Sequence, residues 1–181
     1  GVWDQYRRLA LGRVYYRLGE SDKAVDVLQG AVFAPDEAVA AEALYLYAAA
    51  FFQGGMFELA LNNYLQFADR FPNSVRMPSA IYRAALSHLR LERPQMAKDL
   101  FISALRNIEI LEAQDQGNGA FNDPKSNSEE FDLAQEILFM LVDIALAANR
   151  VEEAASALKK LRSRSRMGLL AAEAGLRYGS H

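Results

Sequence analysis

Four alanines recur at nearly regular intervals, and each follows a turn-like residue by five positions. The pairs are Gly19 with Ala24, Gly55 with Ala60, Glu92 with Ala97, and Asn149 with Ala154. The alanines are 36, 37 and 57 residues apart, so the last interval equals one period plus an insertion of about 20 residues. Periods of this length are typical of helical arrays, in which each helix pair buries its apolar face only against its neighbours. The sequence therefore predicts a stack of helix hairpins.

Apolar spacing and breaker residues predict where the hairpins begin and end. They are expected near residues 2–35, 36–72, 77–114 and 129–165, within a single domain 1–181. In the first hairpin, Leu11, Val14, Tyr15 and Leu18 share a helical face, and Gly19 ends the helix. Ser21 is predicted to cap a second helix that ends near Pro35.

Two segments near the C-terminus depart from the repeat pattern. Residues 114–130 are rich in Gly, Asn, Asp, Pro and Ser and almost free of apolar side chains, so we expect a disordered surface loop. Residues 167–178 form a short apolar-rich stretch that has no partner in the chain. It is predicted to be a terminal helix, either a cap on the stack or the first half of a fifth repeat.

Composition excludes several classes of protein. Hydrophobic residues make up 51% of the chain and charged residues 24%, which predicts a packed protein. The formal net charge of −3 gives no basis for binding nucleic acid, and the absence of cysteine excludes disulfides and thiolate chemistry. No apolar stretch reaches the length of about 20 residues that a transmembrane helix needs. Because the chain opens with Gly1 and ends Gly179-Ser180-His181, we expect it to be excised from a longer protein.

The repeats resemble the tetratricopeptide repeat (TPR) family. The first repeat has family-type residues at the signature spacing, namely Leu11, Gly12, Tyr15, Gly19, Ala24, Leu28 and Ala31, with Pro35 one residue early. The second keeps Leu44, Phe51, Gly55, Ala60, Tyr64 and Pro72, and the match weakens toward the C-terminus. The resemblance implies an all-α fold: a right-handed α-solenoid of about four hairpins plus a C-terminal helix. It also implies a non-enzymatic scaffold that binds a protein or peptide partner.

The end of the second repeat, Phe71-Pro72-Asn73-Ser74, is similar to repeats of bacterial envelope proteins. Two such groups are the coordinator protein of the Tol-Pal system and the lipoprotein of the outer-membrane barrel assembly machine. This similarity implies a role in envelope assembly or maintenance and a periplasmic or envelope-associated location. A cytoplasmic location is the alternative, because any TPR chain can end a helix with these residues.

In TPR stacks the first helices of the hairpins line a concave groove, and this implies a set of partner-binding residues. They are Arg13, Tyr16, Arg17, Tyr45, Phe52, Gln53, Tyr82, Arg83, Arg90 and Phe139. Aromatic and arginine side chains are common at binding hot spots, and arginine binds carboxylates with two parallel hydrogen bonds. We therefore expect a partner that carries acidic and apolar groups. The alternative is that several of these aromatics pack between repeats while the arginines remain solvated.

Chaperone-binding members of the family hold a C-terminal carboxylate with lysine, asparagine and arginine side chains on this face. The matching positions here are Leu9, Arg13, Leu46, Ser79 and Arg83, and only Arg83 agrees. Recognition of a chaperone tail is therefore not expected.

No other feature of the sequence predicts a catalytic, metal or cofactor site. His88, the only internal histidine, is interpreted as a core residue because no convergent ligands accompany it. The basic run from Lys159 to Arg166 is expected to stay solvated at a helix end. Two other functions remain open: self-association through the helix 167–178, and binding of a small apolar ligand between groove aromatics.

Overall fold

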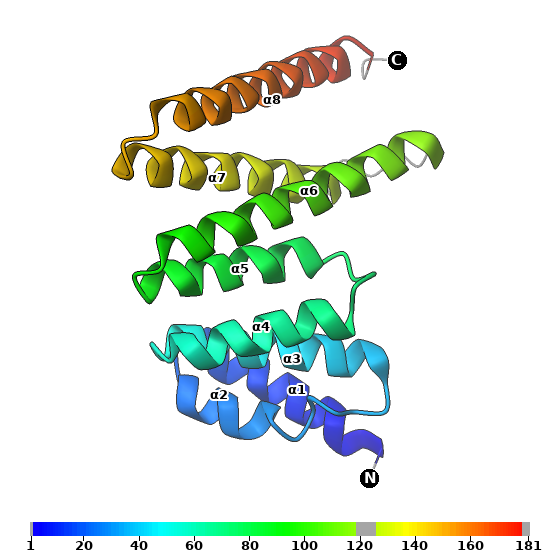
Figure 1. Cartoon of the computed structure of the whole chain (residues 1–181). Helices are drawn as coiled ribbons and strands as arrows, with labels where there is room; N and C mark the ends of the chain where they lie inside the picture. Colours follow the sequence, from blue (N-terminus) through cyan, green and yellow to red (C-terminus); the bar gives the residue numbers. More distant parts are fainter. Residues whose placement is uncertain (1, 119–125, 179–181) are drawn as a thin grey trace. The chain divides into compact units, whose positions relative to one another are not determined.

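The structure, a computed structural model, describes the backbone of residues 2–118 and 126–178 and side-chain burial for 3–114 and 133–165. Within the described backbone the chain has eight helices and no strand (Figure 1). The helices are α1 (Val2–Arg17), α2 (Ser21–Leu28), α3 (Glu37–Gln53), α4 (Phe57–Arg70), α5 (Met77–Arg90), α6 (Pro94–Asn118), α7 (Ser126–Ala147) and α8 (Val151–Tyr178). The all-α class predicted from the sequence is confirmed. Contacts divide the chain into two compact units, Gly1–Ala104 and Leu105–His181, whose boundary lies within α6.

The four predicted turn positions all adopt the left-handed backbone conformation. The φ angles are 77° at Gly19, 78° at Gly55, 58° at Glu92 and 56° at Asn149. Each turn has the same pair of hydrogen bonds: the residue after the turn donates its N–H to the carbonyl five positions earlier, and the turn residue donates to the carbonyl three positions earlier. In the first turn these bonds are Glu20 N to Tyr15 O, 2.9 Å, and Gly19 N to Tyr16 O, 3.1 Å. This pattern is the Schellman motif, which ends a helix by satisfying carbonyl groups of its last turn.

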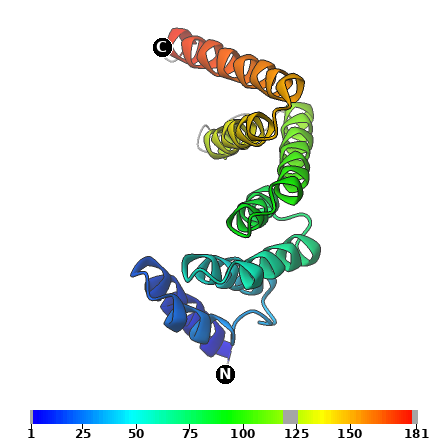
Figure 2. The ribbon, with the colours of Figure 1, turned by 60° about the vertical axis from the view of Figure 1, so that its left-hand side comes forward.

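The repeat alanines lie where the two helices of a hairpin meet. Ala24, Ala60 and Ala97 are fully buried, and Ala154 is 2% exposed. In the first hairpin Gly12 has the same role, because a Cβ added there would lie 2.3 Å from Leu28 Cδ2. Small side chains at these positions let the helices approach closely, and α1 with α2 and α3 with α4 are neighbours in both views (Figures 1 and 2).

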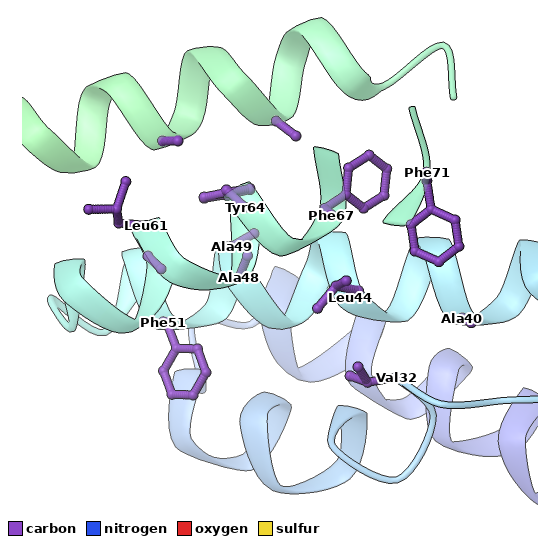
Figure 3. Close-up of a cluster of buried hydrophobic side chains, with 13 residues drawn as sticks. Val32, Ala40, Leu44, Ala48, Ala49, Phe51, Leu61, Tyr64, Phe67 and Phe71 are labelled. Atoms are coloured by element: carbon purple, nitrogen blue, oxygen red, sulfur yellow. The ribbon is translucent and has the colours of Figure 1, made fainter. Parts of the chain in front are cut away.

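The core of the first unit lies between successive hairpins. Tyr64 and Phe67 of α4 are fully buried, and the Phe67 and Phe71 rings pack with centroids 5.3 Å apart (Figure 3). They belong to one apolar cluster to which α3 contributes Leu44 and α5 contributes Ala80. Because this cluster draws on three hairpins, the positions of α3 and α5 depend on stacking rather than on either hairpin alone.

Asp36 fixes the start of α3. Its carboxylate accepts hydrogen bonds from Ala38 N at 2.9 Å and Val39 N at 3.2 Å, which satisfies two free amides of the first turn. The Tyr6 hydroxyl donates to the same carboxylate at 2.7 Å, so α1 also contacts this cap.

The second unit consists of the end of α6 together with α7 and α8. Its buried apolar residues among those described are Leu105 and Ile108 of α6, Ala134, Ile137, Leu138, Val142 and Ala145 of α7, and Ala154, Ala157 and Leu161 of α8. The Arg164 guanidinium donates to Glu112, which joins α8 to α6. None of the described helices in either unit is long and apolar enough to cross a membrane.

The first hairpin differs from the prediction in three ways. Ser21 is not the N-cap: Glu20 occupies that position, its side chain makes no capping hydrogen bond, and the Ser21 hydroxyl donates to Gln53 instead. Helix α2 ends at Leu28, and the chain continues in three-residue turns that keep Ala31 buried. Leu11, Val14 and Leu18 are exposed, since α1 packs through Leu9 and Gly12.

The C-terminal segments also differ from the prediction. Helix α6 continues to Asn118 and α7 begins at Ser126, so the ends of the predicted loop 114–130 are helical, and residues 119–125 lie outside the described residues. The separate helix 167–178 was a wrong prediction, because α8 runs without a break from Val151 to Tyr178. Gly168 alone costs a helix only about 1 kcal/mol, too little to end it without a proline or a cap. The basic run Lys159–Arg166 therefore lies within α8 and not at a helix end.

Candidate functional site

Arg83 of α5 is half-buried among tyrosines from three other helices. Burial alone would lower the pKa of its guanidinium, but Tyr45 of α3, Tyr64 of α4 and Tyr16 of α1 together raise the pKa above its ordinary value. Within the described part of the chain, no carboxylate lies within 4.0 Å of the guanidinium. These four residues are called the Arg83 cluster below. An arginine removed from water without a paired acid is unusual in a folded protein.

Tyr45 is held in place by contacts with four side chains. Its hydroxyl shares a 2.8 Å hydrogen bond with Ser79 Oγ, in which either oxygen can donate. Its ring meets the rings of Tyr64 and Phe67 edge-on, with both centroid distances 5.6 Å. The Arg76 guanidinium carbon lies 5.3 Å from the Tyr45 ring centroid, within the range of a cation–π contact. Tyr45 therefore presents a fixed hydroxyl and ring beside two arginines.

Tyr64 forms the buried base of the cluster. Its side chain is fully buried, and its hydroxyl has no hydrogen-bond partner among the described residues. Burial, followed by the effect of Tyr45, raises the pKa of the Tyr64 phenol far above its ordinary value, so the group stays neutral. The base of the cluster is thus an uncharged phenol at neutral pH.

Two of the predicted groove residues join helices to one another. Arg13 of α1 forms a two-bonded ion pair with Glu42 of α3, in which Nε donates to Oε1 at 2.8 Å and Nη2 donates to Oε2. Gln53 at the end of α3 donates Nε2 to the Tyr16 carbonyl at 3.3 Å and accepts from Ser21 Oγ at 3.0 Å. Both side chains hold α3 against the first hairpin, so neither is free to bind a partner without breaking these contacts.

The other predicted residues have varied environments. Tyr82 is only 5% exposed and packs on Phe101 of α6, with ring centroids 5.6 Å apart, so it follows the alternative of packing between helices. Phe52 is half-buried against Phe57 at 5.2 Å, whereas Arg17 and Arg90 are exposed. Phe139 is 53% exposed and belongs to the second unit, apart from the unit that holds the Arg83 cluster.

Sequence reasoning missed Arg76. The breaker residues from Phe71 to Ser74 put Arg76 in a linker, and no role was expected there. Its spacing of seven residues from Arg83 is the signal that places both on one helix face.

His88 is confirmed as a buried residue, 9% exposed, with Nδ1 lacking a hydrogen-bond partner among the described residues. Burial, followed by the positive charge of Arg93, lowers the pKa of His88 below its ordinary value. In the described part of the chain, no group of three or more His, Cys, Asp or Glu side chains has an arrangement that would hold a metal ion.

Comparisons with known proteins support the repeat interpretation. Residues 9–76 match the family model described as tetratricopeptide repeat. Among solved structures, the chain is similar to the apo form of RapI, with a TM-score of 0.70 and 13% identity, over 93% of this chain and 58% of that one. It thus spans less than two thirds of the RapI chain, and this likeness concerns the fold alone.

Two further structures are more distantly similar. MamA from AMB-1 has a TM-score of 0.45 and 15% identity, over 88% of this chain and 90% of that one. PilF of Pseudomonas aeruginosa has a TM-score of 0.36 and 15% identity, over 88% of this chain and 91% of that one. No curated protein sequence matches the chain.

Proposed function

We propose that this chain, a helical repeat protein whose residues 9–76 match the tetratricopeptide repeat family, is a non-enzymatic scaffold for protein–protein interaction. In this proposal, a peptide or helix of a partner protein binds over the Arg83 cluster, and an acidic side chain of the partner pairs with the Arg83 guanidinium. The proposal involves no catalytic residue, metal or cofactor.

The observation that carries the proposal is the half-buried Arg83, which has no carboxylate partner among the described residues. Elsewhere in the same unit, acids do pair with arginines: Asp4 with Arg7 and Arg8, Glu42 with Arg13, and Glu58 with Arg93. A carboxylate from a partner would give Arg83 charge-assisted hydrogen bonds that no described residue of the chain supplies. Tyr16 and Tyr45 flank this position with half-exposed rings, which suits the apolar part of a bound peptide.

The compartment is part of the proposal. We propose a periplasmic or envelope-associated protein that acts in envelope assembly or maintenance, and the support is the Phe71-Pro72-Asn73-Ser74 ending of the second repeat. A cytoplasmic scaffold is the alternative. Immunoblotting of periplasmic, membrane and cytoplasmic fractions from the source cells distinguishes the two, and a purely cytoplasmic signal would refute the envelope role.

Affinity capture with an Arg83→Gln variant tests partner binding. The substitution removes the charge and keeps a polar side chain of similar length, while Arg7→Gln on α1 is the matched control because Arg7 is exposed and pairs with Asp4. Partners are captured from cell extracts and quantified by mass spectrometry. We expect a partner retained by wild type and by Arg7→Gln but lost by Arg83→Gln. Equal recovery by all three proteins would contradict binding at Arg83.

A second candidate function, self-association, is favoured by an exposed apolar row on α1. On α1, Trp3 is 80% exposed, Leu11 42% and Val14 51%, and Leu18, which directly follows the helix, is 66% exposed; their spacing puts them on one face. Contiguous exposed apolar side chains commonly mark contact surfaces. Sedimentation velocity of wild type and of a Leu11→Glu/Val14→Glu variant tests this function. A dimer that becomes a monomer in the variant supports it, and a monomeric wild type at high concentration refutes it.

A further inference from the structure

Three arginines stand at seven-residue intervals along α5: Arg76 at its N-cap, Arg83 in its middle and Arg90 at its end. Seven residues fall about 20° short of two helical turns, so the three side chains share one face. Arg76 keeps the helical register because its backbone, with φ −85° and ψ −3°, is itself helical. The rise of 1.5 Å per residue separates consecutive members by about 10.5 Å along the helix axis. This set is called the arginine row.

The row is positively charged in a protein of net charge −3. None of its three members has a carboxylate within 4.0 Å in the described part of the chain. Arg76 and Arg83 both contact Tyr45, the first over the ring and the second beside the hydroxyl, so two like charges meet at one side chain. Like charges this close repel each other unless an anion lies between or beside them. The row is therefore a surface that attracts an acidic ligand.

We infer that the arginine row binds an α-helix of a partner protein that carries acidic side chains seven residues apart. This inference rests on the proposed scaffold function and defines the chemistry of its partner. A partner helix that lies along α5 rises about 1.5 Å per residue, as α5 itself does. Acidic side chains seven residues apart on that helix would therefore face all three arginines. Ser79 and Leu86 lie between the arginines on the same face, where they contact the shorter side chains of such a helix.

The three arginines should contribute unequally to the affinity for the partner helix. Arg76 and Arg90 are exposed, and exposed ion pairs of this kind alter affinity by about 1.4- to 5-fold each. Arg83 is half-buried and held among tyrosines, so its charge-assisted hydrogen bonds should raise the affinity for the partner more, by about 10-fold or greater. The central acid of the partner therefore determines most of the affinity, and the outer two set the register.

Fluorescence anisotropy with two synthetic helical probes tests the inference. Both probes are Ala- and Gln-based peptides of about 20 residues, long enough to form helix. One carries three glutamates seven residues apart, and the other carries the same residues with the glutamates five apart, which distributes them around the helix. We expect wild type to bind the first probe at least about 5-fold more tightly, with affinity that falls as salt rises.

Single variants complete the experiment. Arg76→Gln and Arg90→Gln should each lower the affinity for the first probe by about 1.4- to 5-fold, and Arg83→Gln should lower it by about 10-fold or more. Arg7→Gln should leave the affinity unchanged. Equal binding of both probes, or unchanged binding by the Gln variants, overturns the inference. Tighter, row-dependent binding of a single-stranded oligonucleotide than of the first probe also overturns it, because the ligand would then be a polyphosphate.

The outcome also separates this inference from the scaffold proposal. If wild type captures a cellular partner through Arg83 but does not prefer the seven-residue spacing, only the inference about the acidic helix fails. If no partner depends on Arg83 in extracts, the scaffold proposal itself fails.

Discussion

Replacing Glu92 by glycine should raise the free energy of unfolding by roughly 0.5–1 kcal/mol. Glu92 ends α5 with a φ of 58°, the conformation that Gly19 and Gly55 adopt in the equivalent turns. A left-handed backbone costs a residue with a Cβ roughly 1–2 kcal/mol, and glycine avoids this cost but loses about 0.5–1 kcal/mol more backbone entropy on folding. From the centres of the two ranges, about 1.5 and about 0.75 kcal/mol, the net gain is about 0.75 kcal/mol.

Urea unfolding followed by far-UV circular dichroism measures this gain. With an m-value of about 2 kcal/mol/M, the midpoint for the first unit should rise by about 0.25–0.5 M. Glu92→Ala is the matched control, since it removes the side chain and keeps the Cβ, and it should give no such gain. The reverse change, Gly19→Ala, should lower the midpoint by a similar amount, because a Cβ added at Gly19 meets nothing within 4 Å and adds only backbone strain.

The result that would refute this reasoning is a midpoint that rises with Glu92→Ala and stays unchanged with Glu92→Gly. The stability would then depend on the Glu92 side chain and not on the left-handed turn. Asn149→Gly should give a smaller gain than Glu92→Gly, because asparagine tolerates this conformation better than glutamate.

Three further predictions concern packing and ionisation in the first unit. Gly12→Ala should lower the free energy of unfolding by about 1–3 kcal/mol in urea titrations, because the added Cβ would meet the buried Leu28. Gly30→Ala is the control, because its Cβ would meet only the flexible Arg8 side chain. If Gly12→Ala lowered the free energy of unfolding less than Gly30→Ala, the close approach of α1 and α2 would be contradicted. Tyr64→Phe should leave thermal stability unchanged or raise it, because the buried hydroxyl has no partner among the described residues; a clear loss would show that the hydroxyl is bonded. Because the pKa of His88 is lowered in the folded state, the unfolded state binds more protons, and stability should fall as pH drops from about 6.5 through that lower pKa. His88→Gln should reduce this slope in urea midpoints measured across the pH range, and an unchanged slope would assign it to other groups.

The repeat architecture follows from local sequence signals. A small residue five positions after a turn predicts close helix packing, and Ala24, Ala60 and Ala97 are indeed fully buried. Two of the turns were also predictable from local sequence, because Gly19 and Gly55 adopt a left-handed backbone conformation that glycine favours.

The candidate site was less predictable because it depends on contacts between residues distant in sequence. Arg13 belonged to the predicted binding surface, yet it pairs with Glu42, 29 positions later, and nothing local to either residue indicates this pair. Tyr45 and Tyr82 are 37 positions apart and occupy equivalent repeat positions, and each packs on rings of the second helix of its hairpin, yet Tyr82 is buried and Tyr45 remains partly exposed. Burial at one repeat position therefore varies with the side chain that faces it.

Photo-crosslinking at Leu86 would test the central claim, that a partner binds over Arg83, most directly. Leu86 lies one turn from Arg83 on the same face of α5, so a photoreactive amino acid placed there reaches whatever is bound to the arginine row. We expect an adduct with a partner peptide that carries acidic residues, and we expect it to be lost in Arg83→Gln and kept in Glu92→Gly. An adduct that survives Arg83→Gln, or one that forms equally well from the exposed Asn62 of α4, would contradict it.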